Sequence, residues 1–240
     1  MSIAALVLAG AARTASAQDA AVFERVLVPI STSNVPGAYG SLWSTELWYR
    51  NNSTKPVQVF PLAVADAVPT IGVTTRLPIG DFPADAPGTI LFVSRNGGDE
   101  VQFDLRLFNR ADPTASWGTK LPVVRERELA ASVSLINVPT AAAFRSTLRI
   151  YGVPDAVPGT ETVRVRIYDD RERLLAETAV ELRGWPRYAA IGSLADTFPQ
   201  LRQTDRVRIL VDGATVSSRL WAFVSVTSNT TQQVAVITPE

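Results

Sequence analysis

The sequence predicts an all-β protein built from two tandem antiparallel β-sandwiches. Three observations lead to this fold class. Beyond residue 22, apolar residues recur at every second position, as they do in strands with one buried face. The 16 prolines and 14 glycines fall mostly between these runs, where turns are expected. The same order of segments then recurs about 100 residues later. Many short strands with frequent turns are typical of antiparallel sandwiches.

The alternation is clearest in three segments, at 100–109, 161–170 and 205–213. Their predicted inward residues are Val101, Phe103, Leu105, Leu107, Val163, Val165, Ile167, Val207, Ile209 and Val211. The intervening residues are mostly charged or polar, as expected for the solvent side of each strand. Helix signals are scarce. The segment 192–201 is expected to form one turn, capped by Ser193, with Leu194 and Phe198 facing the core and Pro199 ending it. The proline-rich stretch 63–87 is expected to hold loops and one or two short strands.

A weak internal repeat predicts the domain organisation. Thr45–Tyr49 aligns with Ser146–Ile150, and each segment is followed by further alternating strands and a closing hairpin. An offset near 100 residues matches the size of one immunoglobulin-like sandwich. We therefore expect a first β-sandwich domain at 18–126 and a second at 127–240. The mixed-charge run Arg125–Glu128 lies at their boundary without glycine or proline, which favours a stiff link.

The N-terminus has the features of a signal peptide. Residues 3–12 form a short apolar run, and Ala15-Ser16-Ala17 matches the small-x-small pattern that precedes signal-peptidase cleavage. The run is shorter than the roughly 20 apolar residues that span a bilayer. We expect residues 1–17 to be removed and the protein to be extracytoplasmic, with no integral membrane segment after cleavage. The alternative is an N-terminal helix of the folded domain.

The composition excludes several chemistries. The chain contains no cysteine and no histidine, which rules out thiolate or imidazole metal sites and the usual Cys–His and Ser–His–Asp catalytic systems. Its 23 basic and 23 acidic residues give no net basic field, so a nucleic-acid partner is not expected. Asp99, Glu100 and Asp104 are close in sequence, but they lack a calcium-loop spacing, and turns explain them better. We expect no enzyme and no cofactor.

Trp48 is the most informative candidate residue, because it lies on the polar side of an alternating strand. Glu46, Trp48 and Arg50 point to that side, and Thr45, Leu47 and Tyr49 point to the other. An outward tryptophan stacks on ligands such as sugars, so these three residues are the candidate ligand-binding set. The alternative is structural cover, in which Trp48 packs against the other domain, another subunit or the segment 63–87.

Outward arginines predict a second candidate surface, on the strands at 161–170 and 205–213. Its members are Arg164, Arg166, Arg206 and Arg208. If the strands are neighbours, these arginines form a basic stripe suited to an acidic polysaccharide. The simpler interpretation is cross-strand pairing with Glu161, Glu177 and Glu181.

Five stretches are informative together: "RVLVPIS", "GSLWSTELWYRNNSTKPVQVF", "SWGTKLPVVRE", "FRSTLRIYG" and "AFVSVTSNTTQQVAVITP". With these stretches the chain resembles uncharacterised bacterial secreted proteins with tandem immunoglobulin-like β-sandwich modules. The turn at Ser225–Thr231 matches most of a recurrent turn of that group, with Ser228 where an acidic residue is usual. The resemblance implies an extracytoplasmic sandwich protein and carries over no catalytic or binding residues.

These observations predict a secreted, non-enzymatic structural or adhesive module that presents β-sandwich surfaces to a cell-surface or extracellular partner. That partner is an extracellular protein or a polysaccharide of unknown identity. One alternative function is a carbohydrate-binding module that uses exposed aromatic residues. The other is a subunit that self-associates by adding a strand to the open edge of a neighbour's sheet.

Overall fold

A computed structural model describes residues 22–61, 71–77, 88–112, 114, 117–154, 159–213 and 218–239. It confirms the all-β class, with four main antiparallel sheets and only short helical turns. The predicted signal peptide, 1–17, lies outside the described residues, as does most of the segment 63–87. None of the helices in the described ranges is long and apolar enough to cross a membrane.

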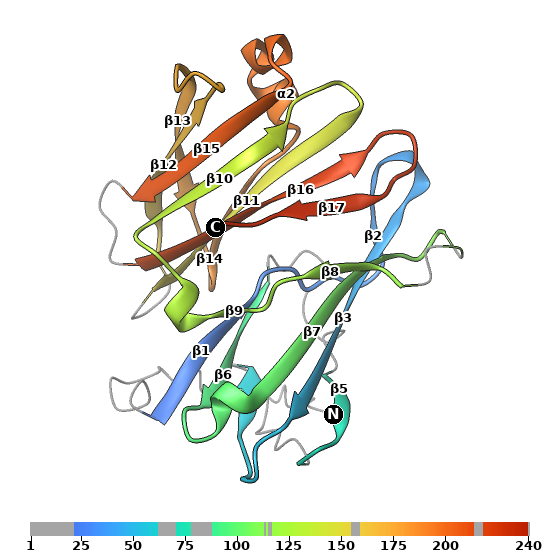
Figure 1. The fold of residues 1–240 in the computed structure, drawn as a ribbon, viewed down its shortest axis with the longest axis vertical. Coiled ribbons are helices and arrows are strands. Elements are labelled where there is room, and N and C mark those ends of the chain that lie inside the picture. The colour runs from blue at the N-terminus through green and yellow to red at the C-terminus, as the bar shows by residue number, and fades with distance from the viewer. Residues whose placement is uncertain are drawn as a thin grey trace, which may run out of the picture.

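The N-terminal half, 22–125, contributes two of the sheets (Figure 1). Its strands are β1 (Phe23–Val28), β2 (Val35–Pro36), β3 (Leu42–Asn51), β4 (Val59–Pro61), β5 (Thr74–Leu77), β6 (Thr89–Ser94), β7 (Val101–Asn109), β8 (Thr119–Leu121) and β9 (Val124–Arg125). One sheet has the order β4-β6-β1-β9, and the other has the order β2-β3-β7-β8 with β5 also paired to β3. Two 3-10 turns, η1 (Ala38–Gly40) and η2 (Gly98–Glu100), lie between these strands.

The C-terminal half, 126–239, contributes the other two sheets, which lie above the N-terminal half in Figure 1. Its elements are η3 (Glu126–Glu128), β10 (Ser132–Pro139), β11 (Phe144–Pro154), β12 (Glu161–Tyr168), β13 (Leu174–Leu182), β14 (Arg187–Ile191), α2 (Leu194–Thr197), η4 (Pro199–Gln203), β15 (Arg206–Gly213), β16 (Ser218–Ser228) and β17 (Val234–Ile237). The sheet orders are β10-β15-β12-β13 and β14-β11-β16-β17.

The strands of the two halves pair in corresponding orders. In the N-terminal half β6 lies between β1 and β4, and in the C-terminal half β15 lies between β10 and β12. The other sheet runs β3-β7-β8 in one half and β11-β16-β17 in the other. An additional strand pairs with the outer side of β3 and of β11, namely β5 and β14. All of these pairs are antiparallel.

Each half buries its own apolar core, and the period-two pattern predicted its members. Val101, Leu105 and Leu107 are buried between the sheets of the N-terminal half. The predicted inward residues of β12 and β15 are buried between the sheets of the C-terminal half. Complete burial of an aliphatic side chain of this size stabilises the fold by about 1.5–3 kcal/mol.

The helical turn predicted at 192–201 is present as α2, and a second turn follows it. Ser193 occupies the N-cap position of α2, but its side chain makes no capping hydrogen bond. Leu194 is fully buried, and Phe198 packs against the same core. Pro199 ends α2 as expected. It then begins the 3-10 turn η4, because a proline at the first helical position sacrifices no backbone hydrogen bond.

Ion pairs fix the link between the halves, Arg125–Glu128. Arg125 is buried and pairs with Glu24 at 2.8 Å, while Glu126 pairs with Arg25 at 2.5 Å. The guanidinium of Arg125 also donates to the carbonyl oxygens of Gly98 and Val101. The mixed charges that predicted a stiff link are therefore the groups that tie it to β1.

Candidate functional site

Trp48 lies on the outer face of the β5–β3–β7–β8 sheet. Its neighbours in β3, Leu47 and Tyr49, are buried in the core of the N-terminal half, while 36% of Trp48 is exposed. Across the sheet Trp48 is paired with Asp104 on β7 and with Arg76 on β5. The predicted outward orientation of Trp48 is thus what the structure shows.

Glu46 and Arg50 lie on the same face, two residues to either side of Trp48. The Glu46 carboxylate lies between two guanidinium groups, 2.5 Å from Arg110 and 3.2 Å from Arg76. Arg50 is exposed and donates from Nε to the side-chain oxygen of Asn52 at 2.8 Å. Glu46 is therefore committed to ion pairs, whereas the hydrogen bonds of Arg50 go to neutral groups.

A second tryptophan joins this face through Arg106. The Arg106 guanidinium carbon lies 4.7 Å from the centre of the Trp117 ring, and Nη1 donates to the Trp117 carbonyl oxygen at 3.2 Å. Nε of Arg106 also donates to Asp104 at 2.8 Å, next to Trp48. Trp117 is 73% exposed. Sequence reasoning missed Trp117 because it precedes β8 in the hairpin, where no alternation reveals its direction.

The contact between the halves uses different aromatic residues from the one predicted. Its buried members are Leu27, Ile90, Phe92, Val124, Leu129, Tyr151, Val153, Trp221 and Phe223, which we call the seam. The outer face of the β14–β11–β16–β17 sheet thereby packs against the outer face of the β4–β6–β1–β9 sheet. Trp48 is not among these residues. Within the described chain, it therefore does not cover the contact between the halves.

The sequence contains a signal for the seam that the alternation pattern concealed. Strands buried on both faces have continuous apolar runs instead of alternating ones. Leu220–Val224 and Ile90–Val93 are such runs, and their odd and even members enter different clusters. Tyr151, a member of the seam, is fully buried, and this burial raises the pKa of its phenol group well above its usual value.

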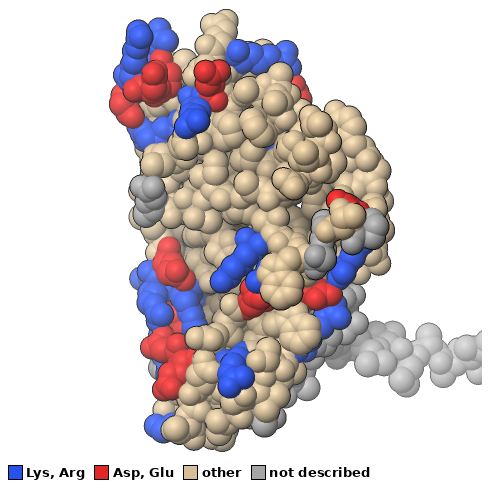
Figure 2. Space-filling view, turned by 45° about the vertical axis from the view of Figure 1, so that its right-hand side comes forward, with Lys and Arg blue, Asp and Glu red and all other residues tan. Residues whose placement is uncertain are grey.

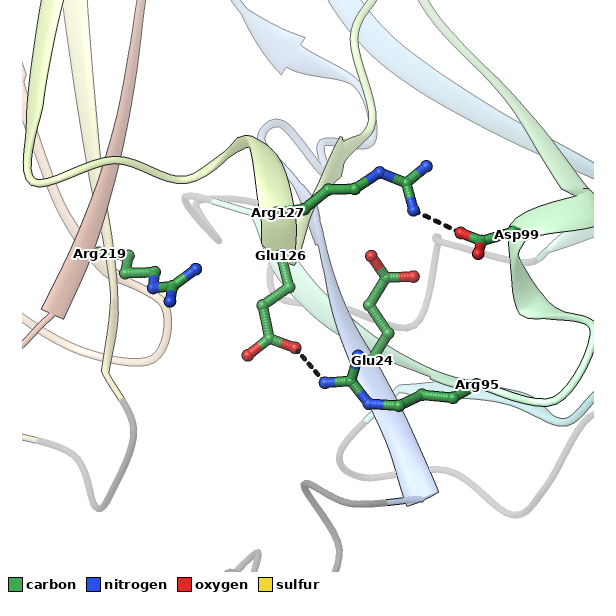
Figure 3. A pocket seen from close by; sticks show the side chains of 6 residues that line it. All are labelled: Glu24, Arg95, Asp99, Glu126, Arg127 and Arg219. Carbon is green, nitrogen blue, oxygen red and sulfur yellow. Dashed lines mark hydrogen bonds and ion pairs between the residues drawn. The ribbon is translucent and has the colours of Figure 1, made fainter.

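A charged cavity of about 270 Å³ lies beside the link (Figure 3). Its lining residues are Glu24, Arg95, Asp99, Glu126, Arg127 and Arg219. Arg95 pairs with Glu126 at 3.1 Å, and Arg127 pairs with Asp99 and lowers the pKa of that carboxyl group. The lining carries three cations and three carboxylates, and Figure 3 marks the pairs of Arg127 with Asp99 and of Arg95 with Glu126. The cavity therefore has no surplus charge to select a ligand.

The predicted basic stripe is present as a row of side chains but is largely neutralised. Strands β12 and β15 are neighbours, as the stripe requires. Arg166 pairs with Asp212, Arg208 pairs with Glu172, and Arg164 lies 3.6 Å from Glu177. Arg206 donates to the side-chain oxygen of Asn137 at 2.6 Å. Of the three expected partners only Glu177 is used, because Glu161 pairs with Arg187 and Glu181 with Arg183.

The acidic cluster at 99–104 does not converge. Asp99 is paired with Arg127 and Asp104 with Arg106, on different elements. Among the described residues, no group of three or more carboxylates is arranged to hold a metal ion. Figure 2 shows acidic and basic side chains next to one another in small groups, with no extended field of one sign on the side of the molecule in view.

The candidate site is therefore the outer face around Trp48 and Trp117, which brings two exposed indole rings and several charged side chains onto one sheet surface. No known family model matches this chain, and comparisons with curated proteins and with solved structures gave no match either.

Proposed function

We propose that this protein is an extracytoplasmic, non-enzymatic adhesive or structural module. In this account a signal peptide at 1–17 precedes two tandem immunoglobulin-like domains, 18–126 and 127–240. The domains pack as one rigid unit and present the face around Trp48 to a partner at or beyond the cell surface. The lack of histidine and cysteine supports a binding role over a catalytic one.

The strand pairing supports the immunoglobulin-like assignment. Constant-type immunoglobulin sandwiches combine one sheet of strands A, B, E and D with another of C, F and G. The orders β1-β6-β4 and β10-β15-β12 fit the sequence B-E-D, and the orders β3-β7-β8 and β11-β16-β17 fit C-F-G. Under this assignment, β5 and β14 are insertions between strands D and E that extend the C-F-G sheet beside strand C.

The seam is the observation that carries the proposal of a rigid unit. Interfaces between domains of one chain are usually polar and permit relative motion. Here Tyr151, Trp221 and Phe223 of the C-terminal half are buried against Leu27, Ile90 and Phe92 of the N-terminal half. Burying an apolar side chain of this size contributes about 1.5–3 kcal/mol, so opening this contact is costly. A contact of this composition holds one sandwich at a fixed angle to the other.

The proposal is tested by export and by retention on cell envelopes. The chain is expressed in a bacterial host with its N-terminus intact, and the mass of the exported protein is measured. We expect a mature chain that begins at Gln18 and sediments with purified envelopes. Trp48→Ala should lose this retention, while Arg164→Gln, on a different sheet, should keep it. A chain that stays in the cytoplasm with residues 1–17 attached, or equal retention of Trp48→Ala, would contradict the proposal.

A carbohydrate-binding module is the second candidate function, favoured by the two exposed tryptophans on one sheet face. A flat sheet with outward indole rings suits the apolar face of a sugar ring. Assembly by strand addition has less support. Glu177, Glu181 and Arg183 lie along or next to the edge strand β13, and charges there discourage pairing with another chain. On another edge strand, β17, the Val234 carbonyl oxygen already accepts a hydrogen bond from the hydroxyl group of Thr119 on β8, which makes it less open to a neighbour's strand.

A further inference from the structure

We propose that the outer face of the β5–β3–β7–β8 sheet binds an anionic polysaccharide, with Trp48 and Trp117 as stacking platforms and the surrounding cations as carboxylate partners. This inference rests on the proposed function, since it names the partner of the same face. We call this surface the tryptophan face. It consists of Glu46, Trp48, Arg50, Arg76, Asp104, Arg106, Phe108, Arg110, Trp117 and Lys120.

Stacking is the first requirement, and both indoles meet it. Trp48 projects from the middle of the sheet and Trp117 from its β7–β8 side, and both are exposed. The Arg106 guanidinium contacts the Trp117 ring by a cation–π interaction. An aromatic side chain with few rotatable bonds gives contact area at low entropic cost. The two indoles therefore offer stacking surfaces on one face of the sheet.

The charge of the tryptophan face selects the class of ligand. Five cations, Arg50, Arg76, Arg106, Arg110 and Lys120, stand against two carboxylates, Glu46 and Asp104. Among the described residues this leaves a surplus of three positive charges on the face, in a chain that has 23 basic and 23 acidic residues in total. A local surplus on a protein without net charge attracts an anion to that face rather than to the whole surface.

Two of these cations are available to a ligand. Arg50 and Lys120 are exposed, and neither forms an ion pair with a described residue. Lys120 is also paired across the strands with Arg106, so two cations lie directly opposite each other. Like charges in this position are destabilising, and a bound carboxylate between them relieves that repulsion. Asp104 pairs with Arg106, so the ammonium group of Lys120 is the charge here that lacks a carboxylate among the described residues.

The C-terminal half shows that this face is specialised. The alignment of 45–49 with 146–150 makes Arg50 equivalent to Tyr151. The cross-strand pairing in each half then makes Gln102 equivalent to Trp221, and Asp104 equivalent to Phe223. In the C-terminal half these positions are aromatic and buried in the seam. In the N-terminal half they are charged or polar, and Gln102 and Arg50 are exposed. One copy of the face is built for packing, and the other is built for a hydrated, charged partner.

An extended polysaccharide fits this surface better than a compact ligand. The face is a sheet surface, and the charged cavity beside the link lies elsewhere. A chain of sugar rings that carry carboxylates can place successive apolar ring faces on Trp48 and Trp117 while its carboxylates contact Arg50 and Lys120. A small anion would use the charges without the indoles, and a neutral glycan would use the indoles without the charges.

The test is isothermal titration of residues 18–240 with polygalacturonate, alginate and hyaluronan. Fully methyl-esterified polygalacturonate is the matched neutral ligand, because it keeps the backbone and removes the charge. We expect binding to at least one anionic chain, at least tenfold weaker binding of the esterified form when polygalacturonate is the ligand, and weakening between about 50 and 300 mM salt. Trp48→Ala and Trp117→Ala should each weaken binding at least tenfold.

The charge variant separates this inference from general carbohydrate binding. Arg50→Gln with Lys120→Gln should weaken anionic binding at least tenfold, and circular dichroism should show an intact fold. Arg164→Gln with Arg206→Gln, on the other half, is the control and should bind as wild type. No binding to any of the three anionic chains, or equal binding of the esterified form, overturns the inference. The same holds if double-stranded DNA binds equally well and the tryptophan variants change nothing.

The outcomes distinguish this inference from the proposed function. Envelope retention that depends on Trp48, without binding to any of the anionic chains, leaves the proposed function intact and rejects the anionic polysaccharide as the partner. If envelope retention does not depend on Trp48 and no anionic chain binds, the proposed function and this inference are both rejected.

Discussion

The phenolic hydroxyl of Tyr151 donates a hydrogen bond to the backbone carbonyl oxygen of Pro29, which joins β11 of one half to the segment after β1 of the other. Tyr151 is fully buried in the seam. A buried carbonyl without a donor is costly, so this bond helps to specify how the halves sit together. It lies among Trp221, Phe223 and Tyr188, whose rings surround that of Tyr151.

Tyr151→Phe removes this hydroxyl group while keeping the ring. We expect the free energy of unfolding to fall by about 1–3 kcal/mol, the cost of leaving the Pro29 carbonyl unsatisfied. Urea unfolding followed by circular dichroism measures it. Tyr39→Phe is the matched control, because Tyr39 is 73% exposed and its hydroxyl should matter little. Equal stabilities for wild type and Tyr151→Phe would show that the bond does not secure the seam.

The same variant changes the alkaline limb of the stability profile. Burial raises the pKa of Tyr151 in the folded state above the value of about 10 of an unfolded tyrosine. The folded chain therefore holds its proton more tightly, and its stability is unaffected below that pH and falls as the pH rises above it. Tyr151→Phe should flatten this fall. Unfolding curves between pH 8 and 11 measure the effect.

Trp221→Ala tests the apolar part of the seam. Trp221 is 5% exposed, and truncating such a side chain costs about 3–5 kcal/mol through lost burial and a residual cavity. Trp117→Ala, at an exposed position, should change the free energy of unfolding by no more than about 0.5 kcal/mol. Urea titrations of both variants make the comparison. Similar losses in the two would mean that Trp221 is not packed as described.

The buried charges of Arg125 and Glu24 depend on each other, so removing one partner alone should destabilise the link. Glu24→Gln leaves the Arg125 guanidinium uncompensated, and we expect a loss of about 3–5 kcal/mol. Glu24→Leu with Arg125→Met should recover much of that loss, since replacing both charges with apolar groups is often neutral. The exposed pair of Arg127 with Asp99 is the control, and Arg127→Gln should unfold close to wild type. Additive losses in the double variant would refute the pairing.

Asp169 should set part of the acid limb of stability. The backbone N–H of Arg173 is the main cause of its lowered pKa, and the N–H of Arg171 and the Arg173 side chain contribute too. A pKa lowered on folding contributes stability above the unfolded value of about 3.9, and this is lost as the pH falls through the folded value. Asp169→Asn should therefore be less stable at neutral pH and show a shallower loss between pH 5 and 2. An unchanged acid limb would contradict this role.

The sequence predicted the cores better than the surfaces. Alternation in 161–168 and 205–213 identified residues that are fully or almost fully buried, because side-chain direction in a strand depends only on local geometry. The same alternation correctly predicted that Trp48 points outward. It did not predict what, if anything, covers the outer face of its sheet. Whether an outer face is covered depends on residues distant in sequence, and Arg149, aligned with Trp48, is half-buried and bonded to Ser225.

The charged residues show the same limit. The strand positions of Arg166 and Arg208 were evident from the sequence, but their partners, Asp212 and Glu172, were not among the expected acids. Asp212 is a diagonal neighbour of Arg166, because the residue directly opposite Arg166 is Leu210. Glu172 lies in the turn between β12 and β13. Long side chains reach diagonal neighbours and turns, which a pattern of alternating residues does not reveal. The contact of Arg106 with Trp117 escaped prediction for the same reason.

We propose that the seam makes the two halves one rigid unit. Native-state hydrogen exchange with increasing urea examines this rigidity, because it reports the opening free energy of each strand. In one rigid unit, the most protected amides of β3 and β7 should exchange with the same free energy as those of β11 and β16, and Trp221→Ala should lower both together. Exchange of β3 and β7 at a clearly lower free energy, with β11 and β16 still protected, would show that the halves unfold separately and contradict the claim.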